Sequence, residues 1–166
     1  MGFHPIGLVT AGLFSLFVLS TQAFAAGTIQ GKRFQDWGGN CQSLAQGQGR
    51  HCYLEQVLQD GEQKVMISVI GYRPGQSLPS MAFELPPNIH LAAGFTLSMN
   101  QGPITRFKGS CTQQRCTASF QLTASILQQF QRGQTAQLSY LSTPHKRPVD
   151  LPLSLMGITA GLKALR

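Results

Sequence analysis

Strand-like segments separated by turn residues recur at intervals of about ten residues along most of the chain. The most clearly defined segment is 64–72, which is rich in β-branched residues. Segment 51–58 precedes it, and Asp60-Gly61 between the two is a typical hairpin turn. Polar and apolar residues alternate in 116–122 and in 134–142, which predicts strands with one buried face. Short strands in series are typical of a β-sandwich or barrel.

Shorter strands and short helices complete the predicted elements. The strands are expected at 32–37, 80–84, 95–100, 104–108 and 149–155. Thr123 is a suitable N-cap for a helix over 124–132, and Gly133 follows as a stop. A second short helix is expected over 158–165. The chain is therefore predicted to be mainly β, a single-domain antiparallel β-sandwich or barrel with one or two short helices.

The N-terminal residues have the pattern of a secretion signal. Residues 6–19 are almost entirely apolar, and Ala23-Phe24-Ala25-Ala26 follows them as a small-x-small cleavage sequence. We expect a signal peptide over 1–25, cleaved after Ala25, and one domain over 26–166. An uncleaved anchor is the alternative, but the apolar run is shorter than the roughly 20 residues of a membrane span. We therefore expect no stable membrane insertion after cleavage.

All cysteines lie beyond the predicted signal peptide, at Cys41, Cys52, Cys111 and Cys116. An even number of cysteines in an exported chain favours disulfide bonds over free thiols. Three connectivities can be drawn, and the sequence alone does not choose between them. Pairing Cys41 with Cys52 and Cys111 with Cys116 is favoured, because each bond then closes a short loop of turn-forming residues. We therefore predict two disulfides.

A redox-active pair and a zinc site are the two other interpretations of the cysteines. A redox-active pair at Cys111 and Cys116 lacks the C-x-x-C spacing and the βαβ context of thiol oxidoreductases. A zinc site that also uses His51 and Cys52 lacks the usual ligand spacing. No metal site and no cofactor are therefore predicted.

Catalytic motifs are missing from the sequence. It contains no G-x-S-x-G, no H-E-x-x-H and no phosphate-binding glycine loop. Asp36-Trp37 is interpreted as a strand-end acid beside a core aromatic residue, because large aromatic side chains usually fill cores. We assign no catalytic residue.

Positive charge is the clearest functional feature that remains. The chain has 13 Lys and Arg against 6 Asp and Glu, a formal net charge of +7. Candidate residues for contact with an anionic partner are Lys32, Arg33, Arg106, Lys108, Arg115, Lys146 and Arg147. A cationic surface without a specific ligand is the alternative, because net charge alone indicates solubility and nonspecific association. Nucleic acid is not expected, since the chain is predicted to be exported and lacks an aromatic-interleaved binding motif.

Several motifs occur in a familiar order. They are Phe34-x-Asp36-Trp37-x3-Cys41, Cys52-x3-Gln56, Leu85-Pro86-Pro87-x-Ile89-x-Leu91, Cys111-x4-Cys116-x-Ala118 and the closing segment from Leu151 to Leu165. Together they resemble the invasion-associated locus B family of exported bacterial proteins. Gly38-Gly39-Asn40 and Ile158 depart from that pattern. The resemblance implies an exported, disulfide-bonded β protein, and it brings no catalytic residue or cofactor.

These features favour an exported, non-enzymatic envelope or secreted protein. It would act by surface contact in adhesion, host-cell entry or envelope integrity, with anionic envelope polymers, host glycans or another envelope protein as partners. The periplasm is the expected location by default, and outer-membrane association and secretion are alternatives. The alternative function is a periplasmic thiol-redox accessory or enzyme that uses the Cys111/Cys116 loop.

Overall fold

The computed structural model describes residues 1–2, 28–44, 49–99 and 102–166. The predicted signal-peptide core and the cleavage site at Ala25 and Ala26 lie outside the described residues, as does the predicted strand end at Asn100. Within the described part of the chain, no helix is long and apolar enough to cross a membrane.

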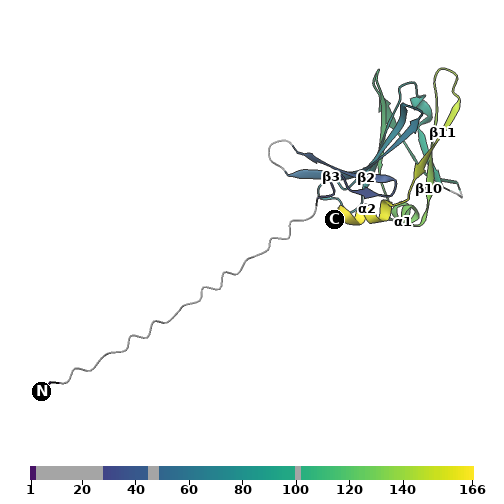
Figure 1. Ribbon diagram of the computed structural model, residues 1–166. Helices are drawn as coiled ribbons and strands as arrows, with labels where there is room; N and C mark the ends of the chain where they lie inside the picture. Colours follow the sequence, from purple (N-terminus) through teal and green to yellow (C-terminus); the bar gives the residue numbers. More distant parts are fainter. Residues whose placement is uncertain (3–27, 45–48, 100–101) are drawn as a thin grey trace.

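Two antiparallel sheets form the body of the molecule (Figure 1). The large sheet has seven strands in the order β1-β2-β3-β4-β5-β9-β8, and the small sheet has four in the order β11-β10-β6-β7. The large sheet contains β1 (Arg33–Phe34), β2 (Trp37–Ser43), β3 (Arg50–Asp60), β4 (Gln63–Gly71), β5 (Ser80–Leu85), β8 (Gly109–Cys111) and β9 (Cys116–Gln121). The small sheet contains β6 (Phe95–Met99), β7 (Gly102–Phe107), β10 (Thr135–Leu141) and β11 (Pro148–Ser154).

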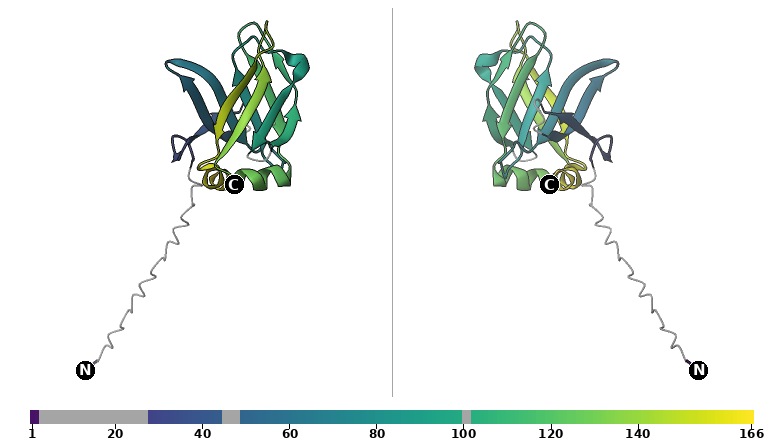
Figure 2. Two further views of the ribbon diagram at one scale, coloured as in Figure 1. Left: turned by 90° about the vertical axis from the view of Figure 1, so that its right-hand side faces the viewer. Right: turned by 90° about the vertical axis from the view of Figure 1, so that its left-hand side faces the viewer.

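Two short α-helices lie together at one end of the sandwich, which we name the helical end (Figure 2). Helix α1 (Ala124–Arg132) connects β9 to β10, and the Thr123 hydroxyl caps it by accepting a hydrogen bond from the Ile126 N–H at 3.2 Å. Helix α2 (Ile158–Ala164) follows β11. The opposite end, which holds the β3–β4, β8–β9 and β10–β11 connections, is the loop end. A single 3₁₀ turn, η2 (Leu91–Ala93), precedes β6.

The core lies between the two sheets and is closed by the helices. Its largest fully buried side chains include Trp37 from the large sheet, Phe95 from the small sheet and Phe130 from α1. Phe107 of β7 packs between the sheets, with its ring centroid 5.7 Å from that of Phe95 and 4.7 Å from that of Phe120. Offset and tilted aromatic contacts at these distances stabilise the edge where the chain passes from β7 of the small sheet to β8 of the large sheet.

The two sheets, two short helices and two disulfides confirm the predicted fold class. The predicted strand over 32–37 is wrong in one respect, because a turn at Gln35 and Asp36 divides it into β1 and the start of β2. Gln35 has a φ of 54°, a left-handed conformation that interrupts a strand. The glycines after Trp37 continue β2. Gly39 leaves no room for a side chain, because a Cβ there would lie only 2.3 Å from the Ile29 carbonyl oxygen.

Candidate functional site

Each disulfide joins two residues that face each other in an antiparallel hairpin. Cys41 of β2 pairs with Cys52 of β3, and Cys111 of β8 pairs with Cys116 of β9. The Cys116 side chain is fully buried, with an exposed fraction of 0%. A nucleophilic thiolate needs access to its substrate, so this burial argues against Cys116 as a nucleophile, whereas its partner Cys111 is only partly buried.

Four of the residues in the family-like motifs meet where the two sheets approach each other. The Trp37 indole N–H donates to the Ser154 carbonyl at 3.1 Å, and the Gln56 amide bonds to both backbone groups of Ser154. The Ser154 hydroxyl donates to the Asp36 carboxylate at 2.5 Å. We name Asp36, Trp37, Gln56 and Ser154 the inter-sheet clasp. Asp36, Trp37 and Gln56 all bond to Ser154, which explains the motif as a structural feature.

The seven candidate basic residues are all exposed, but they lie at two separate places. Five of them lie at the loop end, because each is next to a strand terminus on the side opposite α1. These residues are Arg106, Lys108, Arg115, Lys146 and Arg147. Lys32 and Arg33 lie beside β1, which contacts α2 at the helical end. Arg115 forms an ion pair with Glu84, at 2.7 Å between its Nη1 and the carboxylate oxygen.

Two of the loop-end cations border a groove between η2 and β7, which we name the η2–β7 groove. Its volume is about 490 Å³, and it is lined by Leu91, Ala92, Ala93, Gly94, Phe95, Arg106, Phe107 and Lys108. Arg106 lies on β7, and Lys108 is the one residue between β7 and β8. The two cations are therefore two residues apart, and both line the groove. The lining also includes η2, whose side chains are apolar and exposed.

The shape of this groove depends on a close approach between η2 and β7. Gly94 ends the 3₁₀ turn with a φ of 70°, and a Cβ at this position would lie 3.0 Å from the Phe107 carbonyl oxygen. The Ala93 N–H donates to the His90 carbonyl at 3.1 Å, and the Gly94 N–H donates to the Leu91 carbonyl at 3.0 Å. These bonds fix the turn, since they satisfy backbone groups that would otherwise need water.

The electrostatics of the groove follow from its lining. No carboxylate lines it, and within the described part of the chain neither Arg106 nor Lys108 forms an ion pair. Behind the groove, burial raises the pKa of the Tyr140 phenol, whose ring lies 6.0 Å from that of Phe95. Tyr140 therefore stays protonated and neutral at physiological pH. The groove can attract an anion but holds no pair of groups suited to acid–base catalysis.

Sequence reasoning identified Arg106 and Lys108 but missed η2. A single 3₁₀ turn has no hydrophobic periodicity to detect, and its only local signal is Gly94 directly before a strand. The proximity of Leu91 to Arg106 comes from strand pairing: Phe95 pairs with Phe107 and Thr96 with Arg106. The preceding turn is thereby placed beside the end of β7.

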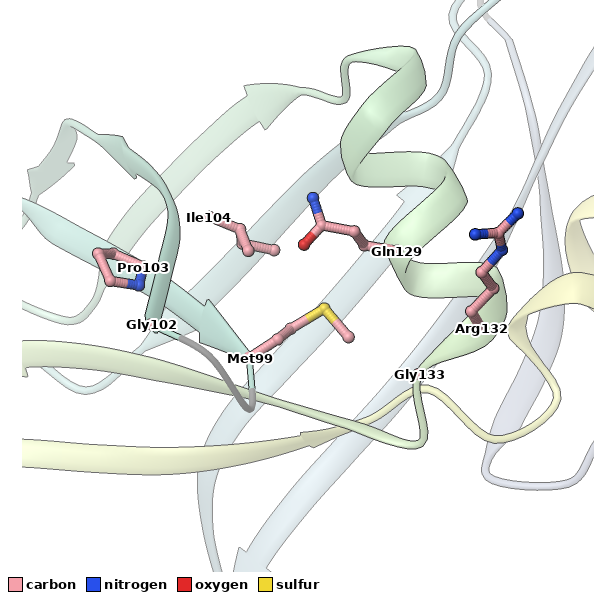
Figure 3. A pocket seen from close by; sticks show the side chains of 7 residues that line it. All are labelled: Met99, Gly102, Pro103, Ile104, Gln129, Arg132 and Gly133. Atoms are coloured by element: carbon pink, nitrogen blue, oxygen red, sulfur yellow. The ribbon is translucent and has the colours of Figure 1, made fainter.

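A second cavity of about 500 Å³ lies where α1 meets the β6 and β7 strands (Figure 3). Gln129 extends from α1 toward Ile104 and Met99, whereas Arg132 at the end of the helix extends away from them. Arg132 is the one ionisable residue in the lining. The cavity therefore offers an apolar floor and an amide, and it contains no catalytic arrangement.

Comparisons with known proteins place these features in a wider context. The family model described as Invasion associated locus B (IalB) protein matches residues 37–166. The crystal structure of invasion associated protein b from Bartonella henselae has a TM-score of 0.70 and 16% sequence identity, covering 81% of this chain and 94% of that chain. At this identity the structural match establishes a shared fold. No curated protein sequence matches the chain significantly.

Proposed function

The chain belongs to the invasion-associated locus B family, and from this premise we propose that it is an exported, non-enzymatic protein that binds anionic partners by surface contact. The partners are anionic polymers of the cell envelope, and the periplasm is the proposed place of contact. Such contacts would support envelope integrity, and adhesion or host-cell entry where the protein reaches the cell surface.

The η2–β7 groove is the observation that carries this proposal. Arg106 and Lys108 border a concave surface without a carboxylate in its lining, so an anion bound there meets attraction without local repulsion. All 13 Lys and Arg side chains of the protein are exposed, and among the described residues one of them, Arg115, is paired with a carboxylate. This distribution supports contact with an anionic partner over internal ion pairing.

The disulfides support a non-enzymatic role over the thiol-redox alternative. Cys111 and Cys116 are bonded to each other across the β8–β9 hairpin, with Cys116 buried and Cys111 partly buried. The five-residue separation of these cysteines and their β-hairpin setting differ from the C-x-x-C pair in a βαβ context that thiol oxidoreductases use. The surface of the protein, with its free cations, is therefore the better candidate for its action.

Binding to anionic polymers tests the proposal directly. Protein purified from cells that express the full chain is titrated with dextran sulfate and with lipopolysaccharide, at low and at physiological ionic strength. We expect binding that weakens as salt rises, because exposed charges are screened. Binding that is absent for both ligands, or that does not change with salt, would overturn the proposed function.

Matched variants locate the contact. The double variant Arg106→Gln/Lys108→Gln removes two cations from the groove, and Arg132→Gln/Lys163→Gln removes two from the helical end. Both variants have the same net charge. We expect the first to bind roughly 10- to 30-fold more weakly and the second to change affinity by less than about threefold, since each cation near an anionic surface contributes on the order of 1 kcal/mol.

A further inference from the structure

We propose that the η2–β7 groove binds a lipid that carries an anionic phosphate headgroup and an acyl chain. This inference rests on the proposed function and adds the chemical class of the ligand. Two kinds of surface meet in the groove, the cations at the end of β7 and the exposed apolar residues of η2.

The apolar wall is the first observation. Leu91 has an exposed fraction of 37%, one of the large hydrophobic side chains that the described structure leaves exposed. Ala92 and Ala93 beside it are exposed as well, and both line the groove with it. Binding of a purely hydrophilic polyanion would not use this apolar surface. An acyl chain would bury it, with each buried methylene adding roughly fourfold in affinity.

The cationic wall is the second observation. The Arg106 guanidinium offers several N–H donors in a planar fork, and the Lys108 ammonium is a compact point charge. Both arrangements suit phosphate oxygens, which accept charge-assisted hydrogen bonds. Because no carboxylate lines the groove, the headgroup that fits is an anion, and a zwitterionic headgroup with its own cation gains less.

The size and position of the groove agree with a single lipid chain and headgroup. A volume of about 490 Å³ is within the usual range for small-molecule sites, which is ~300–1,000 Å³. The cations and the apolar turn line the same groove, so a ligand with a charged end and an apolar end can contact both at once. This combination favours a lipid over free phosphate, which would contact the cations alone.

Calorimetric titration with three monomeric probes tests the inference. The probes are lysophosphatidylglycerol, lysophosphatidylcholine and inorganic phosphate, each added to protein purified from cells that express the full chain. We expect lysophosphatidylglycerol to bind at least tenfold more tightly than the other two. Equal binding of the two lysolipids would overturn the role of the cations, and equal binding of phosphate and lysophosphatidylglycerol would overturn the role of the apolar wall.

A second pair of variants separates this inference from the proposed function. Leu91→Ser removes the apolar contact and leaves both cations, and Met156→Ser is the matched control, because Met156 is 41% exposed and outside the groove. We expect Leu91→Ser to weaken lysophosphatidylglycerol binding at least fivefold while dextran sulfate binding is unchanged. If both ligands bind Leu91→Ser as they bind the unsubstituted protein, the lipid inference is wrong and the proposed function stands. If the unsubstituted protein binds neither, both are wrong.

Discussion

The side-chain amide of Gln56 and the backbone of Ser154, 98 residues apart, exchange two hydrogen bonds across the two sheets. The amide nitrogen donates to the Ser154 carbonyl at 3.2 Å, and the amide oxygen accepts from the Ser154 N–H at 3.0 Å. Trp37 donates to the same carbonyl at 3.1 Å. β11 is the edge of the small sheet, and the Gln56 amide occupies the position that a neighbouring backbone would take. The clasp therefore joins the sheets where no strand pairs them.

Loss of this amide is expected to lower the free energy of unfolding. Gln56→Ala should cost about 1–3 kcal/mol, because two partly buried backbone groups of Ser154 lose a partner. Gln56→Glu should cost at least as much, since its carboxylate cannot donate to the carbonyl. Chemical denaturation measures both, with Gln137→Ala on the exposed face of β10 as the control. A Gln56→Ala variant as stable as the control would show that the clasp contributes nothing.

Gly157 precedes α2 and leaves no room for a side chain. It has a φ of 90°, and a Cβ there would lie 1.9 Å from the Phe34 carbonyl oxygen. Gly157→Ala is expected to cost more than about 3 kcal/mol, because backbone strain and a clash with the main chain add together. Gly75→Ala is the control, since Gly75 also has a positive φ of 75° but has no atom within 4 Å of the Cβ position. It should cost about 1 kcal/mol, and equal costs for the two variants would contradict the close contact at Phe34.

Ser68 is a polar residue inside the core of the large sheet. Its exposed fraction is 0%, and its hydroxyl has no hydrogen-bond partner among the described residues. A buried hydroxyl without a partner costs free energy, so Ser68→Ala is expected to stabilise the protein by up to about 1 kcal/mol. Thermal and denaturant unfolding measure the change, with Ser119→Ala on the exposed side of β9 as the control. Destabilisation of more than about 1 kcal/mol would show that the hydroxyl has a partner after all.

The disulfides are expected to add stability without being required for the fold. They close short loops, with sequence separations of 11 for Cys41–Cys52 and 5 for Cys111–Cys116. Loops of this size correspond to about 2–3 kcal/mol each in the chain-entropy account. The paired variants Cys41→Ala/Cys52→Ala and Cys111→Ala/Cys116→Ala should therefore keep the β-sheet circular dichroism spectrum and unfold at lower denaturant. Loss of that spectrum at 25 °C in either variant would contradict this prediction.

The strand positions were predictable because they depend on local sequence. The run of β-branched residues in 64–72 and the Asp60-Gly61 turn correspond to β4 and the hairpin before it. Thr123 caps α1 as expected, since the hydroxyl and the N–H that it accepts from lie within one helical turn. Gln35 is one exception, since it has no sequence signal for a left-handed conformation. The others are β8 and residues 38–43 of β2, which no predicted strand covers.

The sites were less predictable, because each combines segments that are distant in the chain. The spacing of Asp36, Gln56 and Ser154 gives no indication that they meet. The sequence predicts Trp37 as a core residue but does not reveal that its indole N–H donates to the Ser154 carbonyl of β11. Likewise, the sequence around Lys32 and Arg106 does not indicate that these two exposed cations lie at different places in the fold. The fold places Arg106 in the η2–β7 groove and Lys32 beside β1, which contacts α2.

The sequence by itself determined the alternation of strands and turns, the cap of α1 and the supply of cysteines and cations. These depend on side-chain chemistry and on neighbours within a few residues. The tertiary structure alone decided that Gln56 joins Ser154, that Leu91 and Arg106 line the same groove, and that the basic residues lie at separate places. Those relationships depend on strand order and register, which are set by how both sheets bury their apolar faces against each other.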